Sequence, residues 1–343
     1  MNWNGWRDTI ECLESVLRLD YESFRVIVCD NASGDDSLDR IAEWASGSLT
    51  AGCSNPELKN LSSPPCPKPI PFLRIGPGER VPLGTRGETL ILVQTGANLG
   101  FAGGNNVGLR LALGAGDLDY AWLLNNDTVV EAGALSSLVS TMQGRPDVGI
   151  CGSTLLYYHS PQTVQAFGGS IYNRWTARSG LIGHGRGLDH VPTSHEVERR
   201  MQYVVGASMF VCCSFLEQVG LMDERYFLYF EEIDWAKRAS GLFILAYSRD
   251  SIVYHKEGST IGTAHQVGRR SAISEFYSTR NRILFTRKHF AYALPTVCCA
   301  VLLSAAHRLL SGNWANLGAL IKGVIAGFCV RSSSPPCGAV EYI

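Results

Sequence analysis

Short apolar segments alternate with helical patterns over the first half of this 343-residue chain, and polar residues follow each apolar segment. Apolar residues recur at helical spacing over 7–18, and Asp35 or Ser37 marks the start of a second helix. Strands that alternate with helices fold as a layered, mostly parallel α/β sheet with helices on both faces. The segments with the length and composition of buried strands are 24–30 (FRVIVCD), 89–95 (TLILVQT) and 120–124 (YAWLL).

The second half of the chain continues this pattern less regularly. Further strands are predicted at 148–157, 203–213 and 242–256, with helices at 214–224 and 229–241. One stretch interrupts the pattern, because residues 46–88 contain eight prolines without periodicity and are predicted to form a surface insertion. We therefore expect a sheet domain over 1–262 and a helical tail over 263–343.

The composition is that of a folded, globular chain. Hydrophobic residues make up 45% of the sequence, which is enough for a substantial core. The 30 Lys and Arg residues balance 31 Asp and Glu residues, so we expect no nucleic-acid partner. Eleven cysteines without any Cys-x-x-Cys spacing argue against a disulfide framework or a zinc ribbon. No apolar leader follows Met1, so we expect a reducing, cytoplasmic compartment.

The tail differs from the rest of the chain in its hydropathy. Residues 290–306 carry no charge. A stretch of this length is at the lower limit for crossing a bilayer, and it contains Pro295. Two interpretations stay open. The tail is either a buried helix pair or a peripheral contact with the inner face of the cell membrane, its apolar patch rimmed by Arg282, Arg287 and Lys288. A membrane span is less favoured.

Polar clusters follow three of the predicted strands. Asn and Asp favour turns, but the carboxyl ends of parallel strands also meet at one edge, where open α/β sheets bind ligands. We therefore expect one pocket rather than separate turns. The glycines of the middle cluster lack the spacing of the dinucleotide-binding fingerprint. The clusters are Asp30–Asn31, Asn98–Asn106 and Asn125–Asp127.

A fourth group of polar residues lies in the segment FEEIDW, which contributes Glu231, Glu232 and Asp234. Carboxylates are common in the first turn of a helix, where they face the positive end of its dipole. Next to the aromatic run YFLYF, a carboxylate can also be held as a general base. His255 follows at the end of a predicted strand and is a candidate metal ligand.

Several short motifs, taken together and in order, resemble a family 2 glycosyltransferase of the GT-A (Rossmann-like) fold, and within it the bacterial rhamnosyltransferase-like branch. The resemblance extends from residue 1 to about residue 290, apart from the insertion. Each motif is weak alone, and their order is specific. They are NWNGW, VIVCDNASGDDS, NLGFAGGNN, LLNNDT, VVGASMFV, GLMDERYFLYFEEIDWAKRA, VYHKEGS and FYSTRNR.

The resemblance implies an inverting transfer of a sugar from a nucleotide-sugar to an acceptor hydroxyl, helped by Mg²⁺ or Mn²⁺ at the diphosphate. It assigns Asp127 and His255 to the metal, roughly 4 to 5 Å apart. Glu232 becomes the catalytic base. Asp234 belongs to the same catalytic segment, where it either holds the helix or binds the acceptor.

The resemblance also implies a nucleotide pocket at the sheet edge. Trp3 would lie beside the base, Asp30 and Asn31 would bond its edge, and Asn126 would face the ribose. Asn125 and Asn126 replace carboxylates common in relatives, which predicts a less negative metal site. The family's first strand precedes Asn2, so we expect either a mis-assigned start or a pocket without one wall. The full set of nucleotide-binding candidates is Trp3, Asn4, Asp30, Asn31, Asn98, Gly100, Asn105 and Asn126.

The resemblance favours dTDP-rhamnose as donor, followed by UDP-sugars, and a glycan or lipid-linked acceptor in cell-surface polysaccharide synthesis. Two other functions stay open. A sugar nucleotidyltransferase would need a Gly-rich phosphate loop with Arg after its first strand, which NWNGW lacks and VPLGTRGE at 81–88 only resembles. A non-catalytic nucleotide-sugar or glycan binding module would share the fold without the activity.

Overall fold

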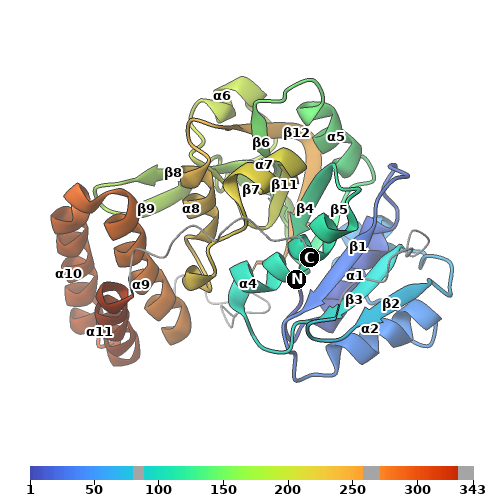
Figure 1. The fold of residues 1–343 in the computed structure, drawn as a ribbon, viewed down its shortest axis with the longest axis horizontal. Coiled ribbons are helices and arrows are strands. Elements are labelled where there is room, and N and C mark those ends of the chain that lie inside the picture. The colour runs from blue at the N-terminus through green and yellow to red at the C-terminus, as the bar shows by residue number, and fades with distance from the viewer. Residues whose placement is uncertain (80–88, 258–270, 331–343) are drawn as a thin grey trace.

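The computed structural model describes residues 1–79, 89–257 and 271–330, and shows two sheets side by side with a helical tail at one end (Figure 1). The first sheet is parallel, with strand order β1-β3-β2. The second is mixed, with order β4-β11-β6-β12-β5 and β7 paired to β6. A small antiparallel sheet, β10-β8-β9, lies toward the tail.

The first sheet carries helices on both faces because its strands are apolar on both sides. Leu90 and Leu92 of β3 pack under α1 and α2, while Ile91 and Val93 face α4 on the opposite side. Such continuous apolar runs are typical of strands in parallel sheets. The elements are α1 (Trp6–Val16), β1 (Val26–Asp30), α2 (Ser37–Ser46), β2 (Phe72–Ile75), β3 (Leu90–Gln94) and α4 (Gly100–Ala115).

Part of the predicted insertion belongs to this sheet. Residues 72–75 form β2, which pairs in parallel with β3 at the sheet edge, and α3 (Lys59–Ser62) follows the short 3-10 helix Pro56–Leu58. The range predicted to be a surface insertion therefore contains regular secondary structure. A strand of four residues among prolines is too short to produce a periodic signal. Residues 80–88, with the stretch VPLGTRGE, lie outside the described residues.

The second sheet forms the larger part of the core. β6 and β12 run parallel, whereas β11 is antiparallel to both of its neighbours, β4 and β6. The helix α5 covers one face, where Leu138 packs with Phe210. The elements are β4 (Tyr120–Leu124), β5 (Thr128–Val130), α5 (Ala134–Met142), β6 (Val148–Tyr157), β7 (Ser160–Phe167), β11 (Ser208–Cys212), α7 (Cys213–Val219), α8 (Glu231–Arg238) and β12 (Ile244–His255).

Three helices form the tail and pack on one another through a small apolar cluster that includes Ile283, Val297 and Leu320. The predicted boundary at residue 262 lies outside the described residues. The tail helices are α9 (Ala272–His289), α10 (Leu294–Leu310) and α11 (Trp314–Cys329), and the small elements before them are β8 (Gly169–Asn173), β9 (Arg178–Leu181), α6 (Ser194–Glu198), β10 (Tyr203–Val204) and the 3-10 helices Glu224–Tyr226 and Ala291–Ala293.

Candidate active site

The N-terminus joins the two sheets where β1 and β4 end (Figure 1). The Asn2 N–H donates to the Cys29 carbonyl at 2.7 Å, and the Asn31 N–H donates to the Asn2 carbonyl at 2.8 Å. The Asn2 side chain donates to Asp30 at 2.7 Å and accepts from Asn126 Nδ2 at 3.2 Å. The first and third polar clusters therefore meet through Asn2, although their strands belong to different sheets.

The middle cluster meets the first through Asn31. Its Nδ2 donates to Asn98 Oδ1 at 3.0 Å and to the Gly100 carbonyl at 3.1 Å, and its Oδ1 accepts from the Leu99 N–H at 2.9 Å. Asp30 and Asn31 are each 1% exposed, and their side chains bond protein groups. These contacts favour a role in shaping the edge over the predicted bonding to a nucleotide base.

Asp127 and His255 converge at this edge. Asp127 follows β4, His255 ends β12, and Asp127 Oδ1 lies 3.2 Å from His255 Nε2. Both side chains are buried. The separation is shorter than the predicted 4 to 5 Å. Two ligand atoms ~2.2 Å from one ion, at a right angle to each other, lie ~3.1 Å apart, so the pair fits adjacent positions around one cation.

The other ring nitrogen of His255 is fixed by a buried glutamine. Nδ1 lies 3.0 Å from Gln165 Oε1, which only accepts hydrogen bonds, so Nδ1 carries a hydrogen. In the neutral ring Nε2 then presents its lone pair toward Asp127, the arrangement seen in histidine ligands held by a second hydrogen bond. Burial works against charge on both residues, but their attraction outweighs it, so the pKa of Asp127 is lowered and that of His255 is raised.

Asp127 and His255 have the chemistry of ligands for a divalent cation, but two residues do not fill its coordination shell. They fit such a cation if the substrate supplies the remaining ligands. Among the described residues there is no group of three or more His, Cys, Asp or Glu side chains that could hold a metal. One carboxylate and one imidazole leave most coordination positions open. Oxygen atoms of a diphosphate are suitable ligands for those positions.

Glu232 lies near the end of β4 from which the chain leads to Asp127. The Asn125 N–H donates to the Ala207 carbonyl at 3.1 Å, so the segment that leads to Asp127 lies beside the start of β11. The preceding residue, Gly206, lies against the Glu232 carboxylate, and a Cβ there would come within 2.5 Å of Glu232 Oε1. Gly206 therefore leaves room for the Glu232 carboxylate in its present position, and the motif VVGAS contacts both the segment before Asp127 and Glu232.

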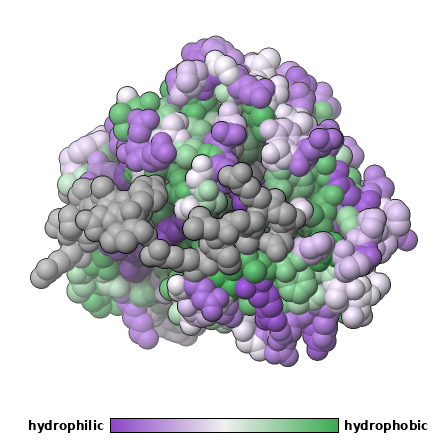
Figure 2. Space-filling view, turned by 45° about the vertical axis from the view of Figure 1, so that its right-hand side comes forward, coloured by the Kyte–Doolittle hydropathy of each residue, from purple (hydrophilic) through white to green (hydrophobic). Residues whose placement is uncertain are grey.

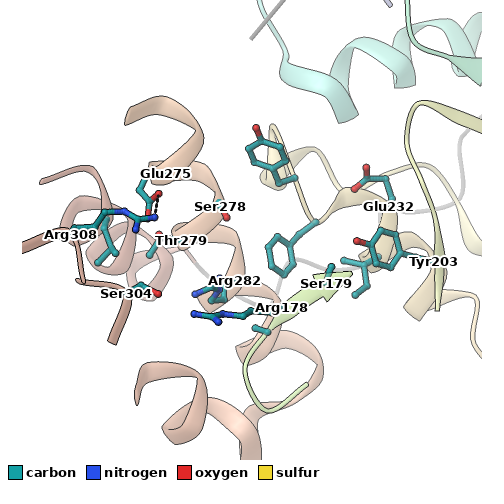
Figure 3. A pocket seen from close by; sticks show the side chains of 15 residues that line it. Arg178, Ser179, Tyr203, Glu232, Glu275, Ser278, Thr279, Arg282, Ser304 and Arg308 are labelled. Atoms are coloured by element: carbon teal, nitrogen blue, oxygen red, sulfur yellow. Dashed lines mark hydrogen bonds and ion pairs between the residues drawn. The ribbon is translucent and has the colours of Figure 1, made fainter. Parts of the chain in front are cut away.

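The environment of Glu232 suits a general base. Burial raises the pKa of Glu232 to about 6, because the ionised carboxylate loses hydration. Its neighbour Glu231 is buried, and burial together with the Glu232 charge raises the pKa of Glu231 well above the ordinary value. Glu232 lines a cavity beside Tyr203, shown in Figure 3, whereas Glu231 does not line it.

Asp234 has different surroundings from Glu232. It is fully buried, and its carboxylate accepts from Arg238 at 3.0 Å, Lys288 at 2.7 Å and Tyr226 at 3.1 Å, with His289 Nε2 at 2.7 Å. Asp234 does not line the cavity that contains Glu232. Of the two roles predicted for Asp234, these contacts favour holding the helix, and they join α8 to α9.

A loop with unusual backbone conformation precedes the two glutamates. Phe227, Tyr229 and Phe230 have φ of 59°, 69° and 74°, which is costly for residues other than glycine. Asn281 of α9 stabilises this loop by donating its Nδ2 to the carbonyls of Tyr226, Leu228 and Tyr229 at 2.7, 2.7 and 2.9 Å. The motif FYSTRNR thus positions, from the tail, the segment that carries the candidate base.

Replacing Asn281 with leucine should therefore lower both stability and activity. Leucine has a similar size but no donor, and the buried carbonyls of the loop lose their partner. We expect the free energy of unfolding to fall by about 1–3 kcal/mol in urea titration, together with a lower kcat and unchanged nucleotide binding. The exposed Asn60→Leu is the control. Wild-type stability and kcat in Asn281→Leu would show that the loop holds itself.

Gly100 supports the same loop from the other side. Its φ is +71°, and a Cβ there would lie 2.2 Å from the Phe227 carbonyl oxygen, which accepts from the Phe101 N–H at 2.6 Å. The glycine predicted to approach a ligand thus approaches the protein's own backbone. This contact joins the start of α4 to the segment that carries Glu232.

The remaining nucleotide candidates lie around the N-terminal loop and α4. Trp3 is half-buried and Asn4 is exposed, with Asn4 Oδ1 accepting from the Gly34 N–H at 2.7 Å. Asn105 Nδ2 donates to the Phe101 carbonyl at 2.9 Å within α4. Of these, Trp3 and Asn4 are accessible to a ligand that lies beside Asn2, where the two sheets meet.

Four residues of the site were not predicted as site residues. Asn281 and Gly206 lie inside motifs that indicated the family, but only the fold shows what they contact. Gln165 had a weak signal, because it is a polar residue among the apolar residues at the end of its strand. Asn2 had none, because its role depends on two strands from different sheets.

Comparisons with known proteins bear on the kind of protein and on its fold. No family model matches the chain. Over 147 residues it is 26% identical to the low-salt glycan biosynthesis hexosyltransferase Agl10 of Haloferax volcanii. The match covers 43% of this chain and 45% of that protein, so it spans less than half of either. The chain is thus related to glycosyltransferases.

A solved structure covers nearly the whole chain. It is the mannosyltransferase PcManGT from Pyrobaculum calidifontis in complex with GDP-Man and Mn²⁺, with a TM-score of 0.50 and 14% sequence identity. The superposition covers 96% of this chain and 85% of that chain. The predicted α/β fold with a parallel sheet and helices on both faces is confirmed, and it is the GT-A fold.

Proposed function

We propose that this protein is a metal-dependent, inverting hexosyltransferase of glycan biosynthesis. The observation that carries the proposal is the Asp127–His255 pair, 3.2 Å apart at the ends of β4 and β12. A buried carboxylate and imidazole at that edge, in a GT-A fold, suit a cation shared with a diphosphate. The related hexosyltransferase supports the reaction class.

The reaction then follows from the positions of Glu232 and the metal pair. The acceptor hydroxyl oxygen forms a bond to the anomeric carbon while the bond to the diphosphate breaks, and the leaving nucleoside diphosphate keeps the electron pair. Glu232 takes the hydroxyl proton. A cation held by Asp127 and His255 would stabilise the charge that develops on the leaving diphosphate. One displacement from the far side inverts the anomeric centre.

For the donor we propose dTDP-rhamnose first, from the motif resemblance, followed by UDP-sugars and GDP-Man. Trp3 and Asn4 are the proposed contacts of the nucleotide. A thermal-shift panel of dTDP, UDP and GDP with and without Mn²⁺ tests this, because a ligand of the native state raises Tm by mass action. Metal-dependent stabilisation by one nucleotide, together with sugar transfer, is expected. Stabilisation without any turnover of donor would favour a binding module instead.

We also propose that the tail helices contact a membrane. Among the described residues, one helical stretch, Ala291–Leu310, is long and apolar enough to cross a membrane by length and composition, with a mean hydropathy of 1.6. Leu303 and Leu310 on α10 are 72% and 87% exposed, and Trp314 of α11 is 66% exposed. Hydrophobic and hydrophilic residues are interspersed over the face drawn in Figure 2. Exposed apolar helices of this kind suit a lipid surface.

The basic residues predicted to rim this surface have other partners. Arg287 donates to carbonyls at the end of α11, at 2.8 Å for Gly327, and Lys288 pairs with Asp223 at 2.9 Å as well as with Asp234. Both side chains thus have partners within the protein, and their place at the rim of a membrane-binding surface stays a prediction. Contact with lipid would then depend mainly on apolar side chains and only weakly on salt.

The chain should accordingly co-sediment with vesicles of phosphatidylglycerol and phosphatidylcholine, with little loss between low and high salt. Leu303→Glu combined with Leu310→Glu should abolish this, since both side chains are exposed and charge is costly in lipid. The control is Leu242→Glu, at an exposed leucine of the sheet domain. Equal sedimentation of wild type and the double variant would reject the membrane contact.

A further inference from the structure

A cavity of about 520 Å³ lies between the catalytic segment and the tail (Figure 3). Glu232 and Tyr203 form one wall, and helices α9 and α10 form another. Its size suits a monosaccharide with one substituent, well within the usual range of ligand pockets. Because Glu232 is the proposed base, the cavity is where an acceptor hydroxyl would lie, and this assignment of the cavity rests on the proposed function.

The cavity is positively charged opposite Glu232. Arg178 of β9 and Arg282 of α9 come from distant parts of the chain, and their side chains lie next to each other in Figure 3. The other acidic residue of the lining, Glu275, is paired with Arg308 at 3.2 Å. Both guanidinium groups of the arginine pair carry positive charge, and an anion between them would lower their mutual repulsion.

Hydroxyl groups complete the lining around these arginines. Ser179 and Thr279 lie on β9 and α9 with the two arginines, and both line the cavity. Two guanidinium groups with nearby hydroxyl donors are the chemistry that binds phosphate, because arginine offers paired donors to phosphate oxygens. Arg178 also lines a second cavity of about 800 Å³, which leaves room for the rest of an extended acceptor.

We propose that the cavity holds an acceptor that carries a phosphate ester, with the phosphate on Arg178 and Arg282 and the sugar hydroxyl at Glu232. The substrate class is then a phosphorylated sugar rather than a neutral glycan. The phosphate ester belongs either to a soluble sugar phosphate or to a lipid-linked sugar. Helix α10 contributes to one wall of the cavity and also carries exposed apolar residues.

Binding of phosphate probes tests this without any sugar transfer. The probes are glucose 1-phosphate and farnesyl phosphate, titrated by calorimetry against the full chain. We expect both to bind the wild type, and Arg178→Gln with Arg282→Gln to weaken binding by roughly 10-fold or more, the effect of losing charge-assisted hydrogen bonds. Tighter binding of farnesyl phosphate would indicate the lipid-linked source, and tighter binding of glucose 1-phosphate the soluble one.

Two further variants make the result specific. Arg200→Gln removes the same charge at an exposed arginine that lines neither cavity, and should leave binding unchanged. Arg178→Gln alone removes an exposed side chain and should fold normally while still weakening the probes. Equal probe binding in the wild type and the double variant, or none in a wild type that binds nucleotide, overturns the inference. Nucleotide binding with Mn²⁺ and transfer to a neutral acceptor would survive that outcome, so the proposed function is tested separately.

Discussion

Glu232→Gln is expected to reduce sugar transfer by ~10²-fold or more while leaving the binding of nucleotide and metal near normal. Glutamine keeps the size of the side chain and its packing against Gly206 but cannot accept the proton of the acceptor hydroxyl. The loss should therefore appear in kcat, with little change in the nucleotide concentration that gives half-maximal thermal stabilisation. Steady-state transfer assays and thermal shift measure the two effects separately.

The pH dependence should identify the same residue. A base works in its deprotonated form, and the pKa of Glu232 is raised to about 6, so kcat/KM of the wild type should fall about tenfold per pH unit below pH 6. The stability effect has the opposite sign. A carboxyl whose folded pKa is raised favours folding when protonated, so its contribution declines as pH rises through about 6. Glu232→Gln should thus unfold at the same or a higher temperature than wild type at pH 8.

Two variants control for this assignment. Glu217→Gln changes an exposed glutamate of α7 and should leave transfer unchanged. Asp234→Asn removes a carboxylate that accepts bonds from α9, so it should lower stability more than Glu232→Gln does. Full turnover in Glu232→Gln, with loss in a folded Asp234→Asn, would move the base two residues along the chain.

Asp127→Asn should abolish the Mn²⁺-dependent rise in Tm caused by the nucleoside diphosphate, and should lower transfer by ~10² to 10³-fold. The asparagine keeps the shape of the side chain but removes the charge that a hard cation requires. Gln165→Leu should have a smaller effect, roughly 10- to 100-fold weaker metal affinity, because it removes only the partner of His255 Nδ1. Calorimetric titration with Mn²⁺ in the presence of nucleotide measures both.

The control for the metal variants is Asp117→Asn, at a carboxylate whose partner is Arg25 on the surface. It should retain the full Mn²⁺ response. A normal Mn²⁺ response in Asp127→Asn would remove this residue from the metal site. It would leave the base assignment untouched, since Glu232 is tested by a different measurement.

Part of the site was readable from the sequence because it depends on local order. Asp127 and His255 each follow a strong apolar strand, and the strand ends of an α/β sheet define its ligand edge. Their positions made each a candidate, and the family resemblance was what assigned both to one metal. Their separation was not readable from the sequence, because it depends on the pairing of β5 with β12, which sets Thr128 opposite His255.

The sequence by itself determined the alternation of strands and helices, the polar residues at the strand ends and the motif order that indicates the family, because all three are periodic or local properties. The tertiary structure alone decided which groups meet. It brought Asn281 from the tail onto the loop before Glu232, placed Asn2 between two sheets and set Arg178 beside Arg282. These contacts join residues far apart in the chain, and no local pattern records them.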